Sequence, residues 1–228
     1  MDDVAGEQRI GQARPPSLAE LAYTQIEEMI VTRRLAPGAM ISENQLGEEL
    51  GMGRTPVREA LARLKLIGFV EVHPRRGVLV SGVDVIRHLE LLEVRRPLEQ
   101  QLVRSAAARA TGEDLAAIES LAGELAEAAS RADRIGYFRA KRLLHQTEVQ
   151  AAYNGVMTMT MGALHAQSRR FWYSYEPVES FAEGARHHGE VARHLVARDG
   201  EGAVRAVGTL FDFLERLTRA ALDRRPLV

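Results

Sequence analysis

The first third of the chain has apolar positions in two different periods, one typical of helices and one typical of strands. Residues 17–32 carry an apolar group every three or four positions, which predicts an amphipathic helix. Ser42 and Gln45 have the spacing of a capping box and predict the start of a second helix, which Gly51 can end in a left-handed backbone conformation. The apolar face of a third helix is formed by Val57, Ala60, Leu61 and Leu64.

The third helix is expected to start with Thr55 as its N-cap and Pro56 at its first position, where the missing N–H of proline is harmless. Two runs of β-branched and aromatic residues follow, at 69–72 and 78–80. The residues between them have the composition of a hairpin turn. Two helices joined by a Gly-containing turn and followed by such a ribbon are typical of a winged helix-turn-helix.

Beyond residue 82 the chain shows helical periodicity alone. We therefore expect a mainly α protein, in which residues 17–82 form the winged helix-turn-helix and residues 83–228 form an all-α bundle of six or seven helices. Residues 1–16 have charges, glycine and proline but few large apolar groups, so we expect a flexible arm there.

Composition narrows the classes of function. The 228 residues include no cysteine, which excludes disulfides and thiolate metal sites, and the net charge is −1. Residues 54–76 nevertheless contain six Lys or Arg against two Glu, a local charge of +4 that suits a phosphate-facing patch. No apolar run approaches the ~20 residues of a membrane span, and no apolar signal-peptide core follows the acidic start. We expect a cytoplasmic protein.

The start of the third helix also resembles a known family. The run Arg54–Leu61, with Leu46–Gly51 before it and Leu66–Val70 after it, resembles the DNA-binding domain of GntR-family bacterial transcription regulators. Eight consecutive residues in register make this resemblance specific. The chain departs from the family at Gly53, where a serine is usual, and this is expected to remove one phosphate hydrogen bond.

The resemblance implies a partner, double-stranded operator DNA, and a set of contact positions. In the family these contacts come from positions that here are Arg34, Arg54, Thr55, Arg58 and Gly77. We add the two cations at the tip of the expected hairpin, Arg75 and Arg76, because guanidinium groups there can reach phosphates.

The helical half resembles the FCD domain of FadR-type GntR regulators, chiefly in the run Leu92–Glu99. Many FCD domains bind a metal through an Asp or Asn, a His four residues later and two further His. Here His145 and His188 match two ligand positions, whereas Lys141 stands at the carboxylate position and Leu210 at that of the third His. An ammonium group repels a metal ion by roughly 4 kcal/mol per unit charge pair at 4 Å in an effective dielectric near 20. We expect no metal and no other cofactor.

We hypothesise that Lys141 replaces the metal as the positive charge of an effector pocket. A carboxylate of a small organic or sugar acid would pair with Lys141 and Arg95 and accept hydrogen bonds from His145 and His188. In the alternative interpretation Lys141 points to solvent and both histidines are ordinary core residues. His165 could line the cavity, and Arg170 is most simply a surface charge.

Together these features predict a ligand-responsive, sequence-specific DNA-binding regulator, and the family resemblance implies that it acts as a repressor. A dimer on a palindromic operator is expected, because one recognition helix reads only a few base pairs. Two alternatives stay open: a constitutive DNA binder with a vestigial pocket, and an enzyme with a histidine-based site in the bundle. We do not expect an enzyme, since the sequence has no Ser-His-Asp arrangement, HExxH pair or phosphate loop.

Overall fold

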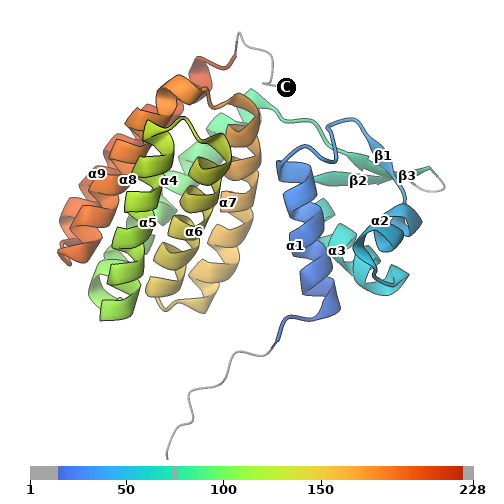
Figure 1. Cartoon of the computed structure of the whole chain (residues 1–228), viewed down its shortest axis with the longest axis horizontal. Coiled ribbons are helices and arrows are strands. Elements are labelled where there is room, and N and C mark those ends of the chain that lie inside the picture. Colours follow the sequence, from blue (N-terminus) through green and yellow to red (C-terminus); the bar gives the residue numbers. More distant parts are fainter. Residues whose placement is uncertain (1–14, 74–75, 223–228) are drawn as a thin grey trace, which may run out of the picture.

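The computed structural model describes residues 15–73 and 76–222, which form two lobes side by side (Figure 1). The arm expected at residues 1–16 lies almost wholly outside the described residues. Arg75 lies outside them as well. The first lobe contains α1–α3 and a small sheet, and the second contains α4–α9. The predicted fold class, a mainly α protein with a small β wing, is confirmed.

The first lobe follows the apolar periodicity of the sequence. Its elements are α1 (Leu18–Val31), β1 (Met40–Ile41), α2 (Glu43–Leu50), α3 (Arg54–Leu66), β2 (Val70–His73) and β3 (Gly77–Val80). β3 lies between β1 and β2 and pairs antiparallel with both. Val78 and Val80 of β3 are buried and share one core with Ile26, Leu61 and Leu64. This core holds the helix-turn-helix and the wing in one unit.

The start of α3 differs from the prediction. Gly53 is the N-cap and makes no side-chain hydrogen bond, while Thr55 and Pro56 follow at the second and third helical positions. The predicted Thr55 cap is therefore wrong. The prediction assumed that Pro56 occupies the first helical position, but the first N–H groups of a helix have no intrahelical acceptor, so proline is tolerated anywhere in the first turn. The predicted ends of α2 are confirmed by the Ser42 capping box and by Gly51, whose φ is 64°.

The second lobe is the expected all-α bundle. Within the described residues its helices are α4 (Val85–Arg109), α5 (Gly112–Ser130), α6 (Arg134–Ala151), α7 (Gly155–Tyr175), α8 (Phe181–Val196) and α9 (Gly200–Arg219). A short 3₁₀ turn, Val178–Ser180, links α7 to α8. None of the helices in the described part of the chain is both long and apolar enough to cross a bilayer.

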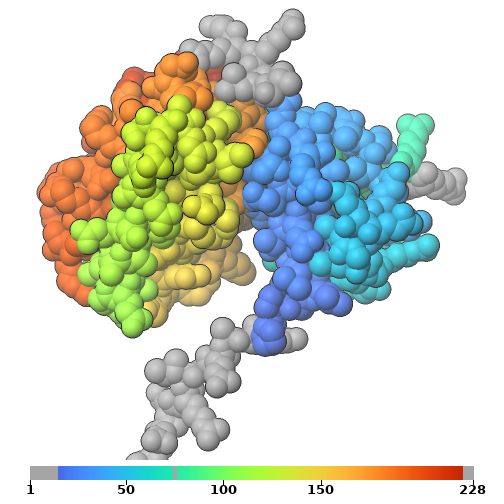
Figure 2. All heavy atoms as spheres, viewed as in Figure 1, coloured from blue at the N-terminus to red at the C-terminus, as the bar shows by residue number. Residues whose placement is uncertain are grey.

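Helix α7 belongs to the bundle but also packs on the first lobe. Its Ala166 lies in the hydrophobic core of the first lobe, and Tyr173 packs against the cores of both lobes. Arg169 forms an ion pair with Glu27 of α1. Figure 2 shows the lobes in contact along α1, with a notch opening between them lower in the view. A change in the position of α7 would therefore change its contacts with the first lobe.

Candidate functional site

The amino-terminal half of α3 presents three of the residues expected to contact DNA. Arg54, Thr55 and Arg58 are all exposed there, and the first turn carries no acidic residue. The first backbone N–H groups of a helix have no intrahelical acceptor. Guanidinium, hydroxyl and backbone N–H groups in one place can donate hydrogen bonds to phosphates and base edges.

Two of the expected DNA contacts are already paired with carboxylates of α2. Arg58 donates from Nε and Nη2 to Oε2 of Glu43, at 3.1 and 2.9 Å. Arg34, which follows α1, donates to Oε1 of Glu49 at 2.7 Å. The Arg58 side chain remains 69% exposed. Exposed ion pairs of this kind are weak, so a phosphate can take the place of either carboxylate.

The wing presents Arg76 and Gly77 on the described side of its tip. Arg76 is exposed, next to the undescribed Arg75. Gly77 has a φ of 110°, and a Cβ atom there would lie 2.8 Å from the carbonyl oxygen of Ile41. A side chain does not fit at this position, so the local backbone requires glycine whether or not Gly77 also contacts DNA.

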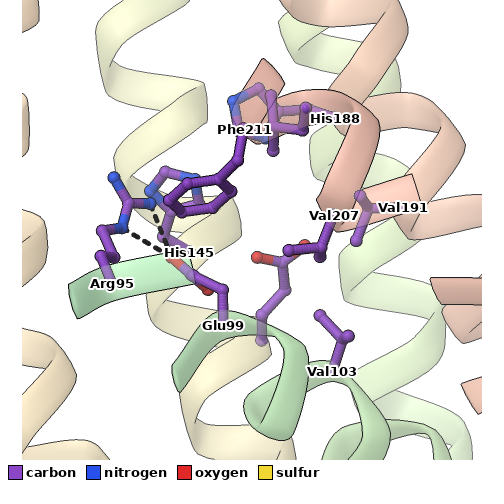
Figure 3. A pocket seen from close by; sticks show the side chains of 10 residues that line it. Arg95, Glu99, Val103, His145, His188, Val191, Val207 and Phe211 are labelled. Carbon is purple, nitrogen blue, oxygen red and sulfur yellow. Dashed lines mark hydrogen bonds and ion pairs between the residues drawn. The ribbon is translucent and has the colours of Figure 1, made fainter. Parts of the chain in front are cut away.

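A narrow cavity lies inside the bundle, and its walls come from α4, α6, α8 and α9 (Figure 3). Its volume is about 10 Å³, which is room for roughly one water molecule. We call it the chamber. The structure thus brings together three of the four residues predicted to bind an effector. The polar residues that line the chamber are Arg95, Glu99, His145, Glu148 and His188.

Glu99 is the hydrogen-bonding centre of the chamber wall. Arg95 donates to its Oε1 from Nε at 2.8 Å and from Nη2 at 2.6 Å. His165 Nε2 lies 2.6 Å from the same oxygen. Burial alone raises the pKa of Glu99, but Arg95 and His165 outweigh it and lower the pKa to about 2. Glu99 was not among the predicted site residues, although its i+4 spacing from Arg95 is a signal for such a pair.

Three imidazoles lie together beside this ion pair. The ring centroid of His145 is 4.7 Å from that of His165 and 5.0 Å from that of His188. Burial and the neighbouring histidines hold the pKa of His145 well below its ordinary value, and burial and Lys141 do the same for His188. The pKa of His165 is also lowered, chiefly by burial. The cluster is therefore neutral near pH 7 and can donate or accept hydrogen bonds.

Lys141 is buried and its charge is already balanced. Its Nζ lies 2.6 Å from Oε2 of Glu176, the residue that ends α7, and Tyr137 donates to the other oxygen of Glu176 at 2.9 Å. The alternative in which Lys141 points to solvent is therefore wrong. This pairing was not predicted from the sequence.

The chamber does not fit a metal of the FCD type. The carboxylate position holds Lys141, which is paired with Glu176, and the position of the third histidine holds Leu210, a chamber-lining apolar residue. In the described part of the chain, no three His, Cys, Asp or Glu side chains are arranged to hold a metal ion.

Glu148 lines the chamber without a counter-charge of its own. The side chain is buried, and Oε1 makes no hydrogen bond to any described residue. Burial, followed by the negative charge of Glu99, raises the pKa of Glu148 to about 8. Glu148 is therefore largely protonated near pH 7, and the whole chamber carries almost no net charge.

The prediction that Arg170 is a surface charge is wrong. Arg170 is 5% exposed, donates to the backbone carbonyl of Ser81, and lies over the ring of Phe69 with Cζ 5.0 Å from the centroid. Both contacts reach from α7 to the first lobe and the segment that leaves it. Helical periodicity alone misses them, since they depend on how the two lobes pack.

Comparison with known families assigns both halves of the chain. Residues 18–80 match the family described as bacterial regulatory proteins, gntR family. Residues 90–213, more than half of the chain, match the FCD domain. These limits lie within the two domains expected from the sequence.

Individual relatives agree with this assignment. The repressor RspR of Escherichia coli is 26% identical over 186 residues, covering 81% of this chain and 82% of RspR. A Streptomyces ambofaciens HTH-type regulator is 43% identical over 77 residues, and the match covers 33% of that protein. Among solved structures, Escherichia coli McbR/YncC superposes with a TM-score of 0.80 at 23% identity, covering 92% of this chain and all of that one.

Proposed function

The chain belongs to the GntR family of bacterial regulators and carries their FCD domain, and on this premise we propose that it is a ligand-responsive repressor that binds a palindromic operator as a homodimer. It is a DNA-binding transcriptional regulator and not an enzyme. We place its action in the cytoplasm, where its DNA partner is found.

One observation carries the DNA-binding proposal: the guanidinium groups of Arg54 and Arg58 are exposed at the amino-terminal half of α3. In a winged helix-turn-helix this part of the recognition helix enters the major groove. We assign Arg54, Thr55 and Arg58 to bases and nearby phosphates. The remaining contacts, to the flanking phosphates, are proposed for Arg34, Arg75, Arg76 and the backbone of Gly77.

The dimer and the palindrome follow from the size of the reading surface. A single recognition helix contacts only a few base pairs, so specificity in a genome needs two half-sites. Two-fold symmetry of the protein then requires a pseudo-palindromic operator with half-sites about one helical turn apart.

The effector proposal concerns the chamber. Arg95, His145 and His188 line it, and Lys141 lies behind it against Glu176. A carboxylate effector would have to exchange with Glu99 for Arg95, or with Glu176 for Lys141. Because the chamber holds about one water molecule, a metabolite must also widen it. Effector binding here therefore requires the helices around the chamber to move apart.

Helix α7 is the proposed route from the chamber to the DNA-binding lobe. One turn of α7 carries His165, which bonds the chamber residue Glu99, and Arg169, which pairs with Glu27 of α1. Opening the chamber would shift His165 and, on the same rigid helix, Arg169. A ligand changes operator affinity only if it binds the two arrangements differently.

Replacing Arg58 by alanine tests the DNA-binding proposal. A guanidinium that reads guanine contributes about 1–3 kcal/mol of discrimination. Operator fragments selected from random DNA should therefore bind Arg58→Ala at least about fivefold more weakly in fluorescence anisotropy. Arg131→Ala, which removes an exposed arginine of the bundle, is the matched control. Equal loss in both variants, or no loss in Arg58→Ala, would contradict the assignment.

A constitutive DNA binder is the second candidate, and the neutral, nearly filled chamber favours it. The two candidates differ in one measurement. A repressor with a working pocket gains thermal stability from its effector by mass action, whereas a constitutive binder gains none from any small acid or sugar acid tested.

A further inference from the structure

A second hollow lies between the two lobes, which we call the junction groove. It is formed where the end of α3 and the start of β2 face α4 and α7, and its volume is about 60 Å³, roughly the space of several water molecules. Ile67 and Phe69 line it from the first lobe. The residues that line it from the second lobe include Arg87, His88, Arg170 and Phe171.

Arg170 brings to this groove a positive charge that rests on the ring of Phe69 but that no carboxylate balances. Its Nη2 donates to the carbonyl of Ser81, but its Nε makes no hydrogen bond, and no carboxylate of a described residue lies within ion-pair distance. Burial alone lowers the pKa of Arg170, to about 10, so the guanidinium stays charged at neutral pH. A buried charge without a counter-ion is costly, and an anion that enters the groove removes this cost.

This situation differs from that in the chamber. There, Arg95 is neutralised by Glu99, and behind the chamber Lys141 is neutralised by Glu176, each at 2.6 Å. An anion that enters the chamber must first break an internal ion pair. An anion that enters the junction groove meets a guanidinium with no carboxylate to displace.

His88 adds a second unpartnered polar atom and an aromatic wall. The side chain is buried, and its Nε2 makes no hydrogen bond to the residues described. The imidazole stacks on Phe171 with ring centroids 3.8 Å apart and an interplanar angle of 8°, and it makes a T-shaped contact with Trp172. In the tautomer with hydrogen on Nε2, the ring can donate one hydrogen bond.

Asp84 and Arg87 also border the groove, at the start of α4. The Oδ1 atom of Asp84 accepts the backbone N–H groups of Ile86 and Arg87 at 2.7 and 3.0 Å. This carboxylate caps α4 and forms no ion pair with Arg170, but its negative charge stays at the rim of the groove. The Arg87 side chain is exposed and adds a positive charge at the rim.

We propose that the junction groove binds the carboxylate of a small organic acid, with Arg170 as its charge partner, His88 as a second donor, and a short apolar or aromatic group of the acid against Ile67 and Leu91, which also line the groove. One cation and one neutral donor suit a monoanion, whereas a phosphate dianion needs more donors. The ligand would touch both lobes and fix their relative position. This regulatory consequence rests on the proposed function, but the binding itself does not.

Benzoate is the probe, and benzamide, which has the same shape without the charge, is its control. Calorimetry on the full chain should detect benzoate and show at least tenfold weaker binding of benzamide. Arg170→Gln should weaken benzoate binding at least tenfold. His88→Phe, which keeps the aromatic stack, should weaken it several-fold and gives the answer if Arg170→Gln does not fold. His188→Ala, in the chamber, should leave benzoate binding unchanged.

Absence of benzoate binding to the native chain, or loss of binding in His188→Ala with retention in His88→Phe and Arg170→Gln, would overturn the proposal. Operator binding without ligand is measured separately by anisotropy. Normal operator binding with no benzoate binding refutes the junction site alone, whereas benzoate binding without operator binding refutes the DNA-binding function alone.

Discussion

The guanidinium of Arg95 and the carboxylate of Glu99 meet one helical turn apart on α4, with Nη2 and Oε1 2.6 Å from each other inside the bundle. Arg95 also donates to Ser168 of α7 at 2.8 Å. The pair thus links two helices around the chamber. It occupies the place where the sequence suggested a free cation for an effector, and its two partners set the charge balance of the whole site.

Breaking this pair from one side should destabilise the bundle. Glu99→Gln leaves the Arg95 guanidinium buried without a counter-charge, a change that typically costs about 3–5 kcal/mol. Urea unfolding at pH 7 should show this loss. The double variant Arg95→Met, Glu99→Met is the control, because it removes both charges and should be more stable than Glu99→Gln. Equal stability of Glu99→Gln and the native chain would mean that the pair is not formed.

The pH dependence of stability should change in Glu148→Gln. The pKa of Glu148 is raised to about 8 in the folded chain, from an ordinary value of 4.5. The folded state therefore holds a proton that the unfolded state has lost, and this group's stabilisation is complete below pH 4.5 and disappears as the pH rises to 8, by about 1.4 kcal/mol per unit.

Glu148→Gln does not titrate, so its stability should match that of the native chain near pH 4 and exceed it at pH 8. Urea midpoints at several pH values test this. Glu119→Gln, at an exposed site on α5, is the control and should follow the native curve. A native curve that does not fall between pH 5 and 8 relative to Glu148→Gln would show that Glu148 is ionised in the fold.

The secondary-structure elements of both lobes could be predicted from local features of the sequence. The helix-turn-helix was predicted from the apolar periodicity of residues 17–82, the Ser42 capping box and the helix end at Gly51. These signals are local in the sequence. The helices of the bundle follow from local caps as well, as Asp84 and Asp133 show. Local patterns therefore predict the elements and the order in which they follow.

The chamber was predicted only in part, because its chemistry depends on partners far apart in the chain. His145 and His188 do line it, as the family resemblance implied. Lys141 meets Glu176, which lies 35 residues away in the sequence, and Arg170 meets the carbonyl of Ser81, 89 residues away. Spacing along one helix cannot reveal such pairs, and the charge state of each group depends on them.

Zinc should not stabilise the native chain. Two of the four family positions hold Lys141 and Leu210, and the remaining histidines alone are a weak site. A thermal-shift assay with micromolar zinc should show no change for the native chain. The triple variant Lys141→Asp, Leu210→His, Glu176→Gln restores the ligand set without an unpaired glutamate, and its melting temperature should rise with zinc. A similar rise in the native chain would contradict the charge argument.

The pair between Arg58 and Glu43 gives the last prediction, which concerns DNA affinity. Glu43 holds the guanidinium of Arg58 in the free protein through contacts at 2.9 and 3.1 Å, and it also places a negative charge beside the surface expected to face phosphates. Glu43→Gln keeps the size of the side chain but removes both effects. Operator affinity in fluorescence anisotropy should therefore rise several-fold at low salt.

The salt dependence separates this electrostatic effect from a change in fold. Because exposed charges are screened, the gain of Glu43→Gln should shrink as the salt concentration rises from about 50 to 200 mM. Glu59, on the exposed side of the same recognition helix, makes no ion pair with Arg58. Glu59→Gln should therefore give a smaller gain in operator affinity. If Glu43→Gln binds the operator no better than the native chain at low salt, then Arg58 does not leave Glu43 to reach DNA, and its role on the operator must be assigned to Arg54.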